Sequence, residues 1–99
     1  MTTINTPSDR IVQIRNRQLD FFRSGCTLDL NYRKAQLRRL GDALTRWESR
    51  LCDALKEDLH KSYEEAVMTE LSIVAGEIRP HIRHLRRWAT PVCRHTPLK

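Results

Sequence analysis

The chain has 99 residues, of which 39% are hydrophobic and 30% charged, so it is long enough for one small domain with a thin core. It contains no apolar run of the roughly 18 residues that a membrane helix needs. The N-terminus also lacks the unbroken apolar segment of a secretory signal. The sequence therefore predicts a cytoplasmic chain with no membrane span.

The formal net charge of +6 is distributed unevenly. Residues 1–78 contain twelve basic and twelve acidic side chains, which cancel, whereas residues 79–99 contain six basic side chains and no acidic one. The chain is thus a neutral body with a basic end. A basic end is compatible with an anionic partner, but it does not by itself identify one.

Residues 1–7 show no periodicity and end at Pro7, which indicates a loose N-terminal arm. Ser8 or Asp9 can cap a first helix, because its side-chain oxygen can accept a free backbone N–H. Glycine adopts a left-handed conformation without a Cβ penalty, so Ser24-Gly25 should end this helix. Its apolar stripe is incomplete and consists of Ile11, Ile14, Leu19, Phe21 and Phe22.

A second helical region should begin at Thr27 or Asp29. Its apolar residues advance by three or four positions, as one face of a helix requires; they are Leu37, Leu40, Leu44, Trp47, Leu51, Leu55 and Leu59. One long helix and a helical hairpin both satisfy this spacing. Two packed helices bury more surface, so we predict a break near residues 45–48.

The last helical region should begin near Ser62, which lies three residues before Glu65 and so forms a capping-box pattern. Pro80 lies within the apolar stripe that follows, and it predicts a kink or a restart of the helix. Residues 91–99 should form an extended basic tail. We therefore predict an all-α fold of three to four helices, with residues 8–90 as the helical segment.

A metal site is the first chemical possibility, since His81 and His84 are three residues apart and Cys93 and His95 follow. Zinc needs about four converging ligands, usually in tighter motifs. Four arginines in the same segment would also repel a cation; they are Arg79, Arg83, Arg86 and Arg87. A solvated polar face is the better interpretation, and we predict no metal-ligating residues.

Acid–base catalysis by residues 58–71 is the second possibility. Glu64, Glu65 and Glu70 do not share one helix face, because steps of one and five residues diverge. Glu65 has a structural role as the partner of Ser62. Catalytic carboxylates also need a cleft that raises a pKa, and nothing in a chain this small indicates one. We therefore predict no catalytic residue here.

The cysteines are the third possibility. Cys26, Cys52 and Cys93 are odd in number and have no CxxC spacing, so they should be free thiols. Cys52 lies among leucines and resembles a small core residue. Cys93, in the basic tail, is the best reactive thiol, yet none of the three has a histidine placed to activate it.

The basic segment RPHIRHLRRW is the fourth possibility. Its arginines follow a helical spacing opposite Ile78, Ile82 and Leu85. Such a stripe could bind phosphate or an anionic surface, and more often it is a solvated helix face. A stand-alone basic helical module that binds nucleic acid or an anionic surface through residues 79–94 is the alternative hypothesis for this chain.

Two stretches, LCDALKEDLHKSYEEAVMTEL and EIRPHIRHLRRWATPVCRHTPL, resemble the N-terminal region of class 3-like aldehyde dehydrogenases. That region reads L..AL..DL.KS..EA..TE and then EI....KHLKKW..P....TPL. The earlier RSGCTLDLNYRKAQLRRL is similar to a third family segment. The chain departs from the pattern at His60, where glycine is frequent, and at Pro80. The matching residues are Leu51, Ala54, Leu55, Asp58, Leu59, Lys61, Ser62, Glu65, Ala66, Thr69, Glu70, Glu77, Ile78, His84, Leu85, Trp88, Pro91, Thr96, Pro97 and Leu98.

The resemblance implies an oxidoreductase that oxidises aldehydes to carboxylic acids with NAD or NADP. In such enzymes the catalytic cysteine, the glutamate base and the cofactor-binding glycines lie after the matched region, and Cys26, Cys52 and Cys93 align with none of them. The resemblance therefore implies a truncated chain without catalytic or cofactor-binding residues of its own. Its expected partners are the remainder of the enzyme and a second subunit in a homodimer, with no nucleic acid.

Overall fold

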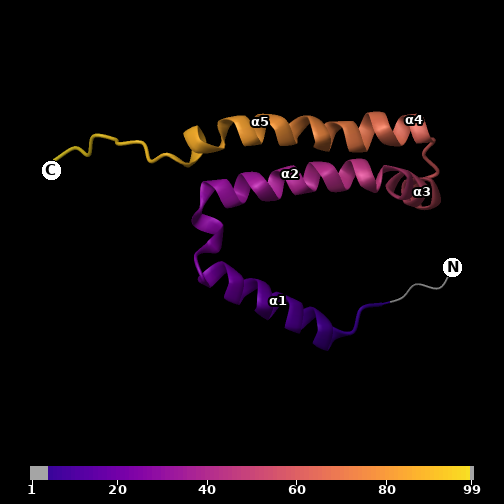
Figure 1. Ribbon diagram of the computed structural model, residues 1–99, viewed down its shortest axis with the longest axis horizontal. Helices are drawn as coiled ribbons and strands as arrows, with labels where there is room; N and C mark the ends of the chain where they lie inside the picture. The colour runs from indigo at the N-terminus through magenta and orange to yellow at the C-terminus, as the bar shows by residue number, and fades with distance from the viewer. Residues whose placement is uncertain (1–4, 99) are drawn as a thin grey trace. The chain divides into compact units, whose positions relative to one another are not determined.

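The structure is a computed structural model that describes residues 5–98, and these residues form helices and no strand (Figure 1). The predicted all-α fold is confirmed. The helices are α1 (Ser8–Arg23), the 3₁₀ turn η1 (Cys26–Leu28), α2 (Leu30–Arg46), α3 (Glu48–Leu59), α4 (Tyr63–Ala66), the π-turn η2 (Val67–Leu71) and α5 (Ser72–Ala89).

The chain divides into two compact units, Met1–Arg33 and Lys34–Lys99. Of the predicted N-terminal arm, residues 5–7 are described and precede α1, whereas residues 1–4 lie outside the described residues. Residues 91–98 adopt neither helix nor strand, and Lys99, at the end of the predicted tail, is also outside the described residues.

The first unit contains α1 and η1. The prediction that Ser8 or Asp9 caps α1 is wrong: the helix already begins at Ser8, and the capping position is Pro7, whose carbonyl accepts the backbone N–H of Ile11 at 3.2 Å. Proline before the first turn provides the start, because its φ is fixed near a helical value. The predicted end is confirmed, since Gly25 has a φ of 83° in the left-handed region that favours glycine.

Asp29 begins the second helical region, as predicted. Its side-chain oxygen accepts the backbone N–H of Asn31 at 3.1 Å, and its carbonyl accepts the backbone N–H of Arg33 at the same distance. The aspartate therefore satisfies one of the free N–H groups of the first turn of α2.

The predicted break near residues 45–48 is confirmed, because α2 ends at Arg46 and α3 begins at Glu48. Trp47 lies between them with φ −101° and ψ 9°, outside regular helix. The guanidinium groups of Arg46 and Arg50 lie 5.9 and 4.8 Å from its ring centroid. These cations lie over the aromatic face at distances typical of a cation–π contact, which helps to fix the tryptophan at the corner.

The helix after Ser62 extends from Tyr63 to Ala89, and α5 continues through Pro80, so a restart at Pro80 did not occur. Proline removes only the bond that its own N–H would give to the carbonyl four residues back, that of Gly76, and its φ suits a helix. Ile78 before Pro80 is buried, and Ile82 after it is half-buried, so the helix packs on both sides of the proline. The irregularity lies instead at η2, where one π-turn interrupts the α-helical hydrogen bonding.

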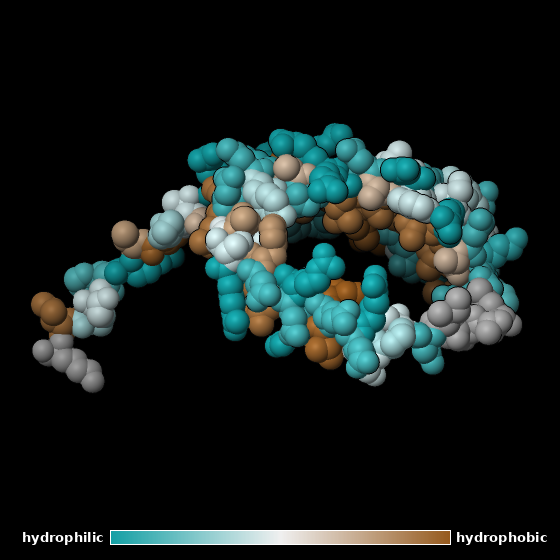
Figure 2. Space-filling model, turned by 60° about the horizontal axis from the view of Figure 1, so that its bottom comes forward, coloured by the Kyte–Doolittle hydropathy of each residue, from teal (hydrophilic) through white to brown (hydrophobic). Residues whose placement is uncertain are grey.

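The second unit packs α2 side by side with the helix formed by α4, η2 and α5, and α3 closes one end of this pair (Figure 1). The Ile78 side chain lies over Gly41, where an added Cβ would be 3.8 Å from Cγ2 of Ile78. In the described residues only Cys52, Ala66 and Ile78 are buried. The core is thin, as the composition predicted, and Figure 2 shows brown apolar surface exposed among teal polar side chains.

Candidate functional site

The stretch 58–71 forms the joint between α3 and the following helix. The Ser62 hydroxyl oxygen accepts the backbone N–H of Glu65 at 3.2 Å, which confirms the predicted cap. The Thr69 hydroxyl donates to the carbonyl of Glu65 at 2.7 Å. Glu64 and Glu65 are exposed, and Ala66 is fully buried beside them. Glu64 and Glu65 therefore lie at a structural corner, whereas Asp58 and Glu70 line a groove between α3 and the following helix.

Lys61 holds this joint closed. Its Nζ donates to Oε1 of Glu70 at 2.7 Å and to the Thr69 hydroxyl at 3.0 Å, and the lysine side chain is only 20% exposed. This contact joins the short connector after α3 to the π-turn eight and nine residues later. Glu70 is thus engaged as the ion-pair partner of Lys61.

Tyr63 links the same joint to the start of α3, since its hydroxyl donates to Oε1 of Glu48. This hydrogen bond, together with the nearby Glu48 charge, raises the pKa of Tyr63. Burial raises the pKa of the Cys52 thiol, and the charges of Glu48 and Asp53 act in the same direction. Cys52 therefore stays a neutral thiol at physiological pH, unlike a catalytic nucleophile.

We expect the Tyr63→Phe variant to reveal the hydrogen bond through its pH dependence. A raised pKa means that the neutral hydroxyl stabilises the fold below its ordinary pKa of about 10, and that this stabilisation disappears as the pH rises through the raised value. The variant should therefore melt at a lower temperature than the wild type at about pH 7, and the difference should shrink above about pH 10.

Thermal unfolding followed by circular dichroism across this pH range measures the effect. Tyr32→Phe is the matched control, because the Tyr32 hydroxyl makes no hydrogen bond with any other residue from 5 to 98. If the difference in melting temperature between Tyr63→Phe and the wild type stays constant between neutral and alkaline pH, the Glu48 contact does not stabilise the unit.

His81 and His84 lie on α5 but face Trp88, with ring centroids 5.3 and 5.5 Å away. His81 Nδ1 is 2.6 Å from the carbonyl of Glu77, which occupies one ring nitrogen. Cys93 and His95 follow in the irregular segment 91–98 and are exposed. Within residues 5–98 the structure gathers no group of three side chains that could hold a metal ion.

The arginine stripe on α5 is solvent-exposed, as its spacing indicated. Ile78 on the opposite face is buried, and Ile82 and Leu85 are half-buried. None of the arginines has an ion-pair partner among the residues that the structure describes; they are Arg79, Arg83, Arg86 and Arg87. The stripe is therefore a charged surface without a carboxylate of its own unit against it.

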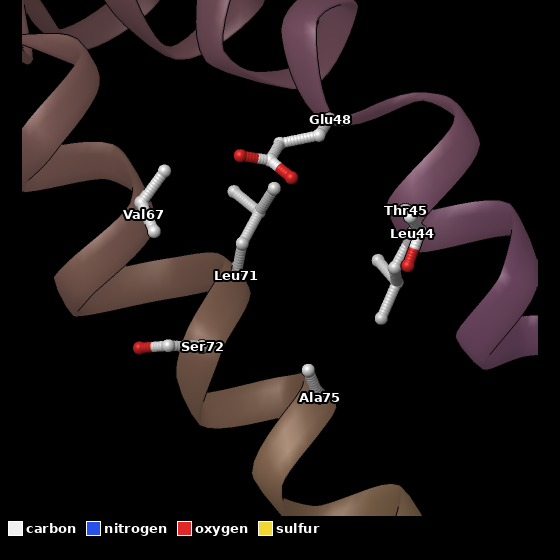
Figure 3. Close-up of a pocket in the computed structure, with 7 residues that line it drawn as sticks. All are labelled: Leu44, Thr45, Glu48, Val67, Leu71, Ser72 and Ala75. Carbon is white, nitrogen blue, oxygen red and sulfur yellow. The ribbon is translucent and has the colours of Figure 1, made fainter.

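Several open grooves lie on the second unit, and two mainly apolar ones among them are the feature that the sequence did not reveal. The smaller, about 130 Å³, separates α2 from the π-turn, and in Figure 3 Leu71 extends across it toward Glu48. The larger, about 270 Å³, lies between α3 and the helix that follows it. Its lining is mainly apolar and comprises Leu44, Leu51, Ala54, Leu55, Asp58, Glu70, Leu71 and Val74.

His60 is a second feature that spacing alone could not predict. It ends α3 in the left-handed region with a φ of 56°, and its N–H donates to the carbonyl of Lys56 at 2.9 Å. A residue other than glycine in this conformation costs about 1 kcal/mol. The only signal in the sequence was the family pattern, in which glycine is frequent at this position.

Comparison with known proteins identifies close sequence relatives. The human aldehyde dehydrogenase family 3 member B1 is 40% identical over 72 residues, which are 73% of this chain and 15% of the relative. The 4,4'-diaponeurosporen-aldehyde dehydrogenase of Staphylococcus aureus is 36% identical over 78 residues, 79% of this chain and 17% of the relative. Aldehyde dehydrogenase family 3 member F1 of Arabidopsis thaliana is 36% identical over 77 residues, 78% and 16% respectively.

The chain therefore spans between 15% and 17% of the length of these relatives. No family model matches the sequence, and no solved structure matches it either. No helix within residues 5–98 is long and apolar enough to cross a membrane.

Proposed function

Because most of this chain is similar in sequence to aldehyde dehydrogenases, we propose that it forms the N-terminal helical segment of a class 3-like enzyme of this kind. The whole enzyme would oxidise aldehydes to carboxylic acids with NAD or NADP in the cytoplasm, as a homodimer. Residues 1–7 would be an arm, residues 8–90 the helical segment, and residues 91–99 the basic tail that leads to the cofactor domain.

The observation that carries this proposal is the structural use of the residues that match the family. Ser62 caps a helix, Lys61 pairs with Glu70, and Ala66 is fully buried. These residues stabilise the corner between α3 and the following helix. An unrelated basic helical module would not need the same residues at the same spacing. The family resemblance therefore lies in the packing of a scaffold segment.

The apolar grooves support a role as a docking segment. Large apolar side chains stay exposed on the second unit, including Leu51 at 38% and Val74 at 45%, and both line the larger groove. A stable domain normally buries such side chains, since each contributes about 1.5–3 kcal/mol when fully buried. We infer that the remainder of the enzyme covers them, and that these helices alone form a fold of only marginal stability.

Catalysis would reside in that remainder. The family's chemistry uses a cysteine thiolate, whereas the pKa of Cys52 is raised by burial. Its general base must be free to accept a proton, whereas Glu70 is paired with Lys61. We therefore expect the purified 99-residue chain to reduce neither NAD nor NADP in the presence of an aldehyde.

A chimaera tests the structural part of the proposal. Residues 8–90 would replace the matching segment of human aldehyde dehydrogenase family 3 member B1, and aldehyde-dependent formation of NADH would be measured. We expect an active chimaera, and loss of most activity when Leu51→Glu puts a charge in the groove. Arg38→Glu, at an exposed position of α2, is the matched control and should stay active.

The results distinguish the two parts of the proposal. A soluble but inactive chimaera, or a groove variant as active as its control, would refute the scaffold role. Aldehyde-dependent NADH formation by the 99-residue chain alone would refute the assignment of catalysis to the remainder.

A further inference from the structure

The second unit carries opposite charges at its two ends. The basic end is the C-terminal half of α5, where Arg79 and Arg83 are exposed, four residues apart and without an ion-pair partner in the part of the chain that the structure describes. Residues 79–99 contain no acid that could neutralise them. Arg86 and Arg87 extend the same surface by one further turn.

The acidic end is formed by α3 and the start of α4. Asp53 and Glu57 are exposed on α3, again four residues apart, and neither is in an ion pair among residues 5–98. Asp58, Glu64 and Glu65 follow within eight residues and are exposed as well. Arg50 and Lys56 each lie three residues from Asp53 and flank it on the helix surface. The acidic end nevertheless keeps a net negative charge, because residues 48–65 contain six acidic and three basic side chains.

The two ends are far apart in one copy. Figure 1 shows α3 and α4 at one end of the pair formed by α2 and α5, with the C-terminal half of α5 at the other. The helix from Tyr63 to Ala89 has an axial length of about 40 Å, at about 1.5 Å per residue. The charges of one copy therefore cannot neutralise one another, whereas those of two copies can.

We propose that the arginine pair Arg79 and Arg83 of one copy binds the acidic pair Asp53 and Glu57 of a second copy of this chain. Both pairs are spaced by four helical residues, about 6 Å along the axis, so two guanidinium groups can face two carboxylates at once. The planar guanidinium fork matches a carboxylate in two parallel hydrogen bonds. This contact goes beyond the proposed enzyme function and does not depend on it.

The surroundings of the arginines favour a carboxylate partner over nucleic acid. Binding of single-stranded nucleic acid combines cations with aromatic side chains on which bases stack. Trp88 is the aromatic residue of this helix, but it lies five positions from Arg83, about 140° around the axis. Its ring is moreover in contact with His81 and His84. The arginine face thus offers charge without a stacking platform.

Charge reversal with rescue tests the proposal, with sedimentation as the measurement of association. The wild-type chain should self-associate, and raising the salt from about 0.05 M to about 0.5 M should weaken it, because exposed ion pairs are screened. The double variants Arg79→Glu/Arg83→Glu and Asp53→Lys/Glu57→Lys should each associate at least about tenfold more weakly. An equimolar mixture of the two should restore association.

Arg38→Glu/Arg39→Glu is the matched control, since it changes the net charge equally at exposed positions of α2. It should associate like the wild type, and circular dichroism should show equal helix content in all variants. A monomeric wild type, association insensitive to salt, or a mixture without rescue would each overturn the proposal. So would salt-dependent binding of an RNA or DNA oligonucleotide that the arginine variant loses while self-association persists.

Discussion

The Ala66→Leu variant is expected to lose most of the folded second unit. Ala66 has no exposed surface and is one of only three buried residues in the described part of the chain, with Cys52 and Ile78. Three additional carbons have no space beside it, and overpacking of this kind costs about 1–3 kcal/mol. A unit with so thin a core has a free energy of unfolding of the same order.

Helix content and thermal unfolding, followed by circular dichroism, measure this effect. Ala54→Leu makes the same chemical change on α3, where Ala54 is exposed and lines the larger groove. This control should unfold at the same temperature as the wild type or at a slightly higher one. Equal stability of the Ala66 and Ala54 variants would show that α4 does not pack as described.

The second large effect is expected in cysteine alkylation. Cys52 is 4% exposed, whereas Cys26 and Cys93 are exposed. Only the thiolate reacts, and burial raises the pKa of Cys52, so accessibility and ionisation act in the same direction. At about pH 8 iodoacetamide should modify Cys52 at least about tenfold more slowly than Cys26 and Cys93.

Mass spectrometry of peptides at successive times gives the three rates. Labelling in urea supplies the intrinsic rates of the three thiols, and the Ala66→Leu variant should lose the protection of Cys52 in the absence of urea. Equal rates for all three cysteines in the wild type would mean that the second unit is not folded, because protection by burial requires the native packing.

The helical parts of the fold could be predicted because apolar residues at steps of three and four constrain a helix face directly. The corner at Trp47, the left-handed Gly25 and the Ser62 cap followed from local chemistry that needs only neighbouring residues. The Asp29 cap belongs to the same class. These signals depend on hydrogen bonds between residues at most four positions apart. The residue types at such neighbouring positions can be read directly from the sequence.

Features that depend on packing could not be predicted. Pro80 breaks a helix in isolation, yet the buried Ile78 and the half-buried Ile82 hold α5 continuous across it. The π-turn at Val67–Leu71 has no sequence signal that we can identify. The start of α1 after Pro7 was missed because Ser8 and Asp9 both resemble caps, whereas the proline already fixes the helical entry.

The chemistry of the candidate site was predicted more completely than its geometry. Ser62 was assigned as a helix cap from its spacing to Glu65, and its hydroxyl oxygen accepts the backbone N–H of Glu65. The reciprocal contact of the Glu65 side chain stays a prediction. The pairing of Lys61 with Glu70 could not be predicted, since it depends on how the π-turn rotates Glu70 toward the connector. The grooves were missed for a related reason, because they arise where three helices fail to meet.

The π-turn has a consequence for how this segment can change in length. A π-turn holds one more residue than the α-helical turn it replaces. When one residue is deleted within Val67–Leu71, the π-turn can therefore become an ordinary α-helical turn. The same face of α5 then stays buried. A deletion elsewhere in the helix would rotate every later side chain by about 100°. The joint is thus the place where sequences of different length can share one fold.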